Sequence, residues 1–322
     1  MSKTLIHNFP NIDRVKVSRI SVTVRNDNAR RKMDSKRQIR LKEWGLLVNT
    51  FKTPQDSYLR GTDGSLSNQP YHLETDVTGF IKTGNVISNP GSKKKVILLG
   101  GSFVESLFAP ETQRFPSQVE RKLHDAGHSL QVLNGGYSGA TLLHVYNTVL
   151  NKVIPLFKYT ERILLFTSMS DNRPQIDADS YWIKHKLHSP LVSDGNPDVY
   201  GPQVPADTQP QFALLRSLIQ LCQEFGQQPI IVLSPFRYAA PGVDDFLTKH
   251  FDSEEKLLSY YGRYTEINDT AKRAAISMGV HYIDLAKAIE GRPKLFYDTL
   301  HLNSKGHQVV ADILTKELVS LL

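Results

Sequence analysis

The chain of 322 residues carries a formal net charge of +7 and a single cysteine. This length provides enough apolar surface for one large or two small domains, and the lone Cys222 excludes an internal disulfide. No apolar run approaches the ~20 residues of a membrane-spanning helix, and residues 1–15 lack the apolar region of a signal peptide, so we expect a cytoplasmic protein.

The positive charge is concentrated near the N-terminus. Residues 1–60 contain 14 Lys or Arg against 5 Asp or Glu. We interpret this segment as a solvated surface whose long basic side chains pack on the rest of the protein. The alternative is that it binds nucleic acid, an acidic polymer or an anionic membrane surface.

The same region is predicted to be an extension of the main domain. Residues 15–24 alternate apolar and polar side chains, as a strand does, and residues 28–48 indicate a basic helix. Residues 50–91 are rich in Gly, Pro, Ser, Asn and Thr, which is typical of an extended loop region. We therefore expect a basic extension of strand, helix and loop over residues 1–91, followed by one domain over residues 92–322.

From residue 95 onward the pattern alternates between strands and helices. Short apolar runs predict buried parallel strands at residues 96–99, 130–133, 163–166, 230–233 and 280–283. Helices are predicted between them at residues 117–125, 141–151, 212–224 and 257–277, and a last helix is predicted to start from a Ser304 cap. The fold class is therefore α/β, a doubly wound parallel sheet of about five strands flanked by helices, which binds ligands at the carboxyl ends of its strands.

Two long segments interrupt this alternation, at residues 173–210 and 235–254. The first contains six prolines and can hold little regular structure. Loops of this length are more often functional than idle. We therefore predict that the two segments contact the substrate through Tyr181, Trp182, His185, Arg237 and Tyr238.

Two short motifs supply residues with the chemistry of a hydrolytic triad. Ser102 comes directly after the first predicted strand, and Asp298 and His301 lie three residues apart near the C-terminus. A Ser hydroxyl needs a base to become a nucleophile, and the base needs an acid that orients it. These three residues therefore predict a triad with the chain order Ser, Asp, His.

These motifs, together with the sequence from Asn134 to Gly139, resemble those of the SGNH (GDSL-like) hydrolase family over residues 95–322. The resemblance implies a flavodoxin-like sheet, with Ser102 as nucleophile, His301 as base and Asp298 as the orienting acid. It also implies an oxyanion hole built from the backbone N–H groups of Ser102 and Gly139.

The chain departs from the family pattern at two points. Gly101 stands where the family usually has Asp, and the sequence from Ser168 to Asn172 replaces Gly-x-Asn-Asp. The side-chain oxyanion donor is therefore either Ser170, at the aligned position, or Asn172. We favour Asn172, because it keeps the amide donor of the family.

The sequence favours a serine esterase that removes an acyl group, most simply acetyl, from an oxygen ester of a carbohydrate or small molecule. One alternative is an O-acyltransferase that uses the same triad with a sugar hydroxyl as acceptor, and another is a catalytically silent SGNH-like binding or scaffold protein. We expect no metal, because the histidine pairs at residues 124 and 128 and at residues 185 and 188 lack a third ligand. We also expect no cofactor, because the Gly-Gly-Ser sequence lacks the lysine of a phosphate-binding loop. A small-molecule or glycan ester is the expected partner, and the oligomeric state is left open.

Overall fold

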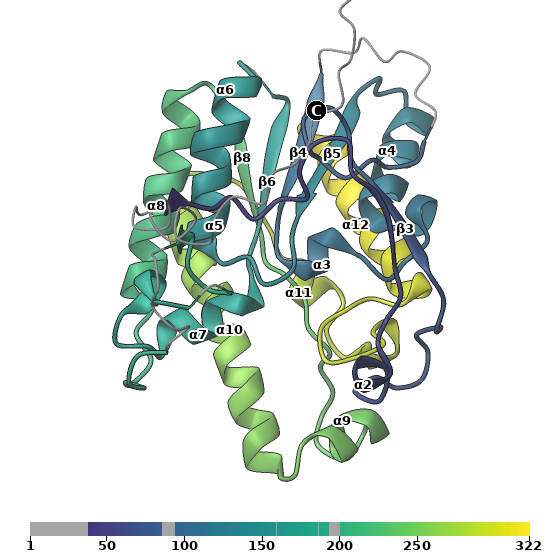
Figure 1. Ribbon diagram of the computed structural model, residues 1–322, viewed down its shortest axis with the longest axis vertical. Coiled ribbons are helices and arrows are strands. Elements are labelled where there is room, and N and C mark those ends of the chain that lie inside the picture. Colours follow the sequence, from purple (N-terminus) through teal and green to yellow (C-terminus); the bar gives the residue numbers. More distant parts are fainter. Residues whose placement is uncertain (1–37, 86–93, 159, 186, 193–199) are drawn as a thin grey trace, which may run out of the picture.

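A parallel sheet forms the centre of the protein in the computed structural model, which describes residues 38–85, 94–158, 160–185, 187–192 and 200–322. Its strands are β4 (Lys95–Gly100), β5 (Gln131–Gly136), β6 (Arg162–Phe166), β8 (Pro229–Val232) and β9 (Tyr282–Ile283). Their order across the sheet is β5-β4-β6-β8-β9, and each neighbouring pair is parallel. The predicted fold class is confirmed, and each predicted apolar run overlaps one of these strands (Figure 1).

Helices cover both faces of this sheet because its strands are apolar on both sides. Successive side chains of a strand point to opposite faces, so Val96 and Leu98 pack in one buried cluster while Ile97 and Leu99 pack in another. The first face is covered by α4 (Phe115–Asp125) and α12 (Ser304–Leu321). The second face is covered by α5 (Leu142–Thr148), α8 (Gln209–Glu224) and α10 (Glu254–Ser277) (Figure 1).

Shorter elements complete the domain. A helical turn, α3 (Ser102–Glu105), follows β4, and α5 continues through a π-helical turn (Val149–Val153) into α6 (Ile154–Leu156). The first inserted segment holds α7 (Asn172–Gln175), a 3₁₀ turn (Ser180–Trp182) and β7 (Leu191–Val192). The second holds α9 (Asp245–His250), and α11 (Leu285–Ala288) follows β9.

The N-terminal region differs from the prediction. Where it is described, it contains β1 (Gln38–Ile39), β2 (Asn49–Lys52), α2 (Asp56–Leu59) and β3 (Tyr71–Glu74). The predicted helix over residues 28–48 is wrong from residue 38 onward, because β1 pairs with β7 and the positive φ angles of Gly45 and Leu47 are incompatible with a helix. Residues 50–91 are likewise not loop throughout, since β2 and β3 form an antiparallel pair within them. The strand predicted at residues 15–24 lies outside the described residues.

The start of the last helix is also corrected by one residue. The Asn303 side chain accepts a hydrogen bond from the backbone N–H of Gly306 at 3.1 Å, so Asn303 caps α12 and Ser304 is its first residue. Asn and Ser are equally good caps, so the sequence alone did not separate them.

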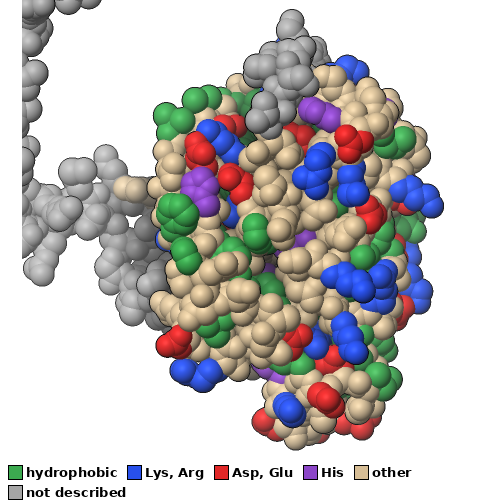
Figure 2. Space-filling model, turned by 90° about the vertical axis from the view of Figure 1, so that its right-hand side faces the viewer, with side chains coloured by type: hydrophobic (Ala, Val, Ile, Leu, Met, Phe, Trp, Pro, Cys, Tyr) green, Lys and Arg blue, Asp and Glu red, His purple; other side chains and the backbone are tan. Residues whose placement is uncertain are grey.

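The surface that carries α4, α12 and β3 has a mixed composition. Figure 2 shows Lys and Arg side chains interspersed there with acidic and apolar ones. None of the helices in the described residues is both long and apolar enough to span a membrane.

Gly136, at the end of β5, sets the approach of α3 to the sheet. A Cβ at this position would lie 2.1 Å from the backbone nitrogen of Glu105, a distance that requires the backbone to move. We expect Gly136→Ala to lower the free energy of unfolding by about 3 kcal/mol, measured by urea denaturation. Gly262→Ala on α10 is the control, because no atom lies within 4 Å of its Cβ position, and it should be neutral or raise stability by about 0.5–1 kcal/mol. Equal stability of Gly136→Ala and the unchanged protein would contradict this close approach.

Candidate active site

The structure brings the three predicted triad residues together at the carboxyl edge of the sheet. Ser102 is the first residue of α3, directly after β4, and its Oγ lies 2.7 Å from Nε2 of His301. Nδ1 of His301 in turn lies 2.7 Å from Oδ2 of Asp298. The order Ser–His–Asp in space is therefore the one that passes a proton from the hydroxyl to an oriented imidazole.

The Asp298 carboxylate is held by four hydrogen bonds. Its Oδ1 accepts the backbone N–H groups of Leu300 at 2.7 Å and His301 at 2.6 Å. Its Oδ2 accepts from the His301 ring and from the hydroxyl of Tyr58 at 3.1 Å. Burial raises the pKa of Asp298, but the charge and hydrogen bonds of His301 outweigh burial, so the pKa lies below its ordinary value. The acid is therefore ionised and fixed in place beside the base.

The position of His301 gives it a pKa above the ordinary value. Burial lowers the pKa of His301, but the charge and hydrogen bond of Asp298, with a smaller contribution from Glu105, together outweigh burial and raise it. A base is active only in its neutral form, so we expect the acidic limb of the kcat/KM profile to lie above pH ~6.5, the ordinary imidazole pKa. A pH series with a soluble acetyl ester measures this limb. A limb below pH 6 would contradict the assignment of His301 as the base.

Tyr58 is the side chain at this site that the sequence analysis missed. It comes from α2 in the N-terminal region, and its Oη lies 3.4 Å from both Nδ1 of His301 and Oη of Tyr297. Burial and the nearby Asp298 carboxylate raise its pKa, so the hydroxyl keeps its proton and can donate it in a hydrogen bond. Tyr58 thus brings the N-terminal extension into contact with the triad residues. A single Tyr among loop residues gave no signal of its role.

Removal of the Tyr58 hydroxyl is expected to weaken the triad without abolishing it. Tyr58→Phe should lower kcat by about tenfold with little change in KM, because one hydrogen bond to a charged group is worth about 1.5–3 kcal/mol. The less stabilised Asp298 carboxylate should also hold the protonated His301 more tightly and move the acidic limb to higher pH. Tyr71→Phe is the matched control, since the Tyr71 hydroxyl bonds only to the carbonyl of Ser67 among the described contacts. A wild-type kcat and pH profile in Tyr58→Phe would rule out this positioning role.

Lys42, from the same N-terminal region, holds the loop that carries Gly139. Its Nζ donates to the carbonyl oxygens of Gly139 at 2.8 Å, Leu187 at 2.7 Å and Ser138 at 3.3 Å. An ammonium group has three donors, so these carbonyls use all of them. Burial lowers the pKa of Lys42 to about 8, with a smaller contribution from Arg40. Gly139 has a φ of +70°. The hydrogen bond from Lys42 to the Gly139 carbonyl oxygen helps to hold this turn in place.

Glu105 links the serine turn to the same loop. It is 1% exposed and accepts hydrogen bonds from Trp44 Nε1 at 2.8 Å and from the Ser138 hydroxyl. Burial raises the pKa of Glu105, while those two hydrogen bonds act in the opposite direction. The N-terminal region, α3 and the Gly139 loop are therefore joined through one buried carboxyl group.

The two departures from the family pattern are neighbours in space. A Cβ on residue 101 would lie 3.0 Å from Oγ of Ser168, and that hydroxyl donates to the carbonyl of Ala140. The chain thus lacks a side chain at Gly101, where the family pattern has Asp, and has one at Ser168, where the pattern has Gly. The Ser168 side chain therefore lies next to the position that a side chain on residue 101 would take.

The third oxyanion donor remains a prediction. Asp171, which lies between the two candidates, accepts the backbone N–H of Leu142 at 2.8 Å, and burial raises its pKa to about 7. Ser170 lies in a 3₁₀ turn (Met169–Asp171) and is half-buried. Asn172 begins α7, and its Oδ1 is buried without a hydrogen-bond partner among the described residues.

The predicted substrate contacts lie in different environments. Tyr181 is 1% exposed within the core cluster under the sheet, so its prediction as a substrate contact is wrong. Arg237 is 3% exposed and its guanidinium is bound to Asp63 and Asp244, which the alternation pattern could not reveal. The other three remain predictions: Trp182 is exposed, His185 stacks on Tyr200, and Tyr238 packs on Tyr261. Over the described residues, no group of three His, Cys, Asp or Glu is placed to hold a metal ion.

Comparisons with known proteins give remote likenesses. No family model matches the chain, and no curated protein matches it. Among solved structures, an alpha/beta hydrolase enzyme from the metagenome of Lake Arreo in Spain is 18% identical with a TM-score of 0.48, covering 71% of this chain and 96% of that one. A variant of an acetyl xylan esterase from Geobacillus stearothermophilus is 16% identical with a TM-score of 0.49, covering 71% and 95%. A GDSL-like lipase from Bacteroides thetaiotaomicron is 11% identical with a TM-score of 0.47, covering 71% and 90%.

Proposed function

We propose that the protein is a serine ester hydrolase of the SGNH type, which removes an acetyl or other short acyl group from an oxygen ester of a carbohydrate or small molecule. The observation that carries the proposal is the continuous chain of short contacts, 2.7 Å from Ser102 Oγ to His301 Nε2 and 2.7 Å from His301 Nδ1 to Asp298 Oδ2. The match of Ser102, Gly139, Asp298 and His301 to the family motifs supports it.

The proposed reaction has two steps. In the first, Ser102 Oγ attacks the acyl carbon while its proton moves to Nε2 of His301, which then gives that proton to the leaving alcohol. In the second, His301 takes a proton from water while the oxygen of that water attacks the acyl carbon on Ser102; the bond from that carbon to Ser102 Oγ then breaks, the carboxylic acid leaves, and His301 returns its proton to Oγ. Asp298 stabilises the imidazolium in both steps, and the backbone N–H groups of Ser102 and Gly139 bind the oxyanion.

A polar substrate suits the surroundings of this site better than a lipid ester does. The large open pocket beside the catalytic loop, of about 900 Å³, is lined mainly by charged and polar side chains. A long acyl chain requires an extended apolar wall, whereas hydroxyl-rich substrates are bound by groups that donate and accept hydrogen bonds. The polar lining of this pocket therefore supports a polar alcohol as one part of the ester.

Turnover of p-nitrophenyl acetate and of p-nitrophenyl octanoate, each with and without a free sugar, tests the proposal. We expect hydrolysis of the acetate at a rate that the sugar does not change, with slower turnover of the octanoate. Transfer of the acetyl group to the sugar as the main reaction would establish the acyltransferase in its place. Failure of a fluorophosphonate probe to label Ser102, together with no turnover, would establish a silent protein.

A further inference from the structure

An open pocket of about 900 Å³ lies beside the triad but is separate from it. It lies between α2, α9 and the loop of residues 296–303, and no triad side chain lines it. The backbone N–H of Asp63 donates to the carbonyl of Tyr297 at 2.8 Å, and that of Arg237 donates to the carbonyl of Thr299 at 2.9 Å. Two residues that line the pocket are therefore hydrogen-bonded to the residues directly before and after Asp298.

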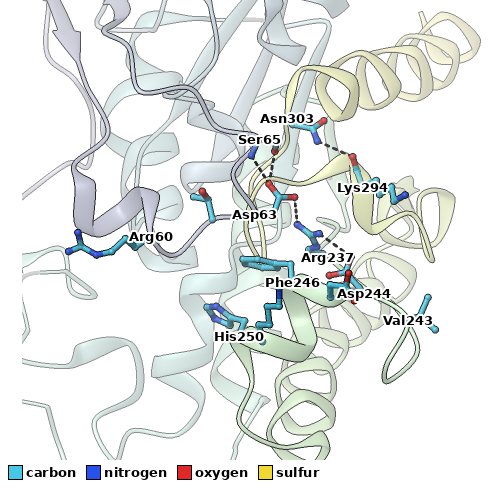
Figure 3. A pocket seen from close by; sticks show the side chains of 13 residues that line it. Arg60, Asp63, Ser65, Arg237, Val243, Asp244, Phe246, His250, Lys294 and Asn303 are labelled. Carbon is cyan, nitrogen blue, oxygen red and sulfur yellow. Dashed lines mark hydrogen bonds and ion pairs between the residues drawn. The ribbon is translucent and has the colours of Figure 1, made fainter.

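Most of the contacts on the floor of this pocket are formed among its own residues, although Nε of Arg237 is buried without a hydrogen-bond partner among the described residues. Arg237 donates to Asp63 Oδ2 at 2.7 Å and to Asp244 Oδ2 at 3.0 Å, and Figure 3 shows it between the two carboxylates. Asp63 Oδ1 accepts from Ser65, and Asn303 donates to the carbonyl of Lys294 at 2.9 Å. These groups therefore shape the pocket and have little capacity left for a ligand.

The cations around the rim are different, because they have no such partners. Arg60, Lys249 and Lys294 are exposed and form no ion pair with a carboxylate among the described residues. Figure 3 shows Arg60 and Lys294 on opposite sides of the row formed by Asp63, Arg237 and Asp244. Separated cations suit a ligand that carries several anionic groups along its length, since each group gains a charge-assisted hydrogen bond.

The aromatic ring in the pocket argues against a nucleic-acid base as that ligand. The Arg237 guanidinium lies 4.4 Å from the centre of the Phe246 ring, and the His250 ring packs at 5.3 Å from it. Base recognition relies on free aromatic faces for stacking, and this ring is covered by its neighbours. An anionic sugar chain, which needs charge and hydrogen bonds, fits these groups better.

From these observations we infer that the pocket binds an acidic oligosaccharide, one that carries carboxylates on successive sugar units, and that this is the alcohol part of the ester. The second half of the inference rests on the proposed esterase function. Binding in the pocket would place a hydroxyl ester of a neighbouring sugar unit toward Ser102 across the loop of residues 296–303.

Calorimetric titration of the full-length protein with tri-galacturonate and with neutral xylotriose tests the binding directly. We expect the acidic trisaccharide to bind at least tenfold more tightly than the neutral one and to lose affinity as salt is added. Lys249→Glu and Arg60→Glu should each weaken that binding by tenfold or more. Lys316→Glu, the same charge change on the distant part of α12, should leave it unchanged.

Three outcomes would overturn the inference: equal binding of both trisaccharides, equal weakening by Lys316→Glu, or displacement of tri-galacturonate by a mononucleotide at lower concentration. Titration requires no turnover, and fluorophosphonate labelling of Ser102 is measured in parallel. Labelling without saccharide binding would therefore refute the pocket and leave the esterase standing. Binding without labelling would refute the esterase and leave the pocket as a saccharide site.

Discussion

Ser102→Ala is expected to reduce the hydrolysis of p-nitrophenyl acetate by at least about 10⁴-fold, and His301→Ala by a similar factor. The reason is that the two side chains form one proton-transfer unit through their 2.7 Å contact, and neither works without the other. Asp298→Ala should cost somewhat less, because His301 remains next to the nucleophile. Steady-state kinetics on variants with unchanged circular dichroism measures these losses.

The double variant Ser102→Ala/His301→Ala gives a sharper test. If the residues act as a unit, the double variant should be no slower than either single one. Ser320→Ala serves as the matched control, since its hydroxyl bonds only within the last turn of α12 among the described contacts. Activity of Ser102→Ala close to that of the unchanged protein would contradict the assignment of the triad.

Asn172→Ala is expected to lower kcat by about 10²-fold with little change in KM, while Ser170→Ala has a mild effect. A side-chain amide that binds the oxyanion contributes only in the transition state, so its loss lowers kcat and leaves substrate binding intact. The Asn172 Oδ1 has no hydrogen-bond partner among the described residues. No hydrogen bond of this oxygen therefore ties the side-chain amide to another part of the described structure.

The control for this prediction is Asn151→Ala, whose amide donates to the carbonyl of Asn147 away from the site. The opposite ranking, with a large loss in Ser170→Ala, would assign the donor to Ser170. Two mild variants would mean that the backbone N–H groups of Ser102 and Gly139 suffice.

The sheet could be predicted, and so could the meeting of Ser102, Asp298 and His301 at its edge, because their signals are local. Buried parallel strands such as residues 163–166 are continuous apolar runs, and Ser102, Asp298 and His301 lie in short motifs. The contribution of Tyr58 could not be predicted, because its partners lie about 240 residues away and nothing in its neighbours marks it. The environment of Lys42 could not be predicted for a related reason. A cation in a basic segment suggests a solvated surface, whereas tertiary packing buries Lys42 against three carbonyl groups.

The predicted substrate contacts show a different limit. Tyr181 and Arg237 were singled out because they lie in long insertions, and a long insertion indicates that a segment is functional without indicating which side chains face outward. Burial of Tyr181 and the ion pairs of Arg237 depend on residues brought in from other parts of the chain.

The scattering of the site along the chain also bears on how the protein becomes active. During synthesis Tyr58 and Ser102 leave the ribosome long before Asp298 and His301, so the growing chain contains Ser102 well before its contact partner His301. The contacts that unite them span 199 to 243 residues, and closing such long loops is slow compared with forming a helix. We therefore expect the candidate site to assemble late in folding, because Ser102 meets His301 only when these distant segments have packed together.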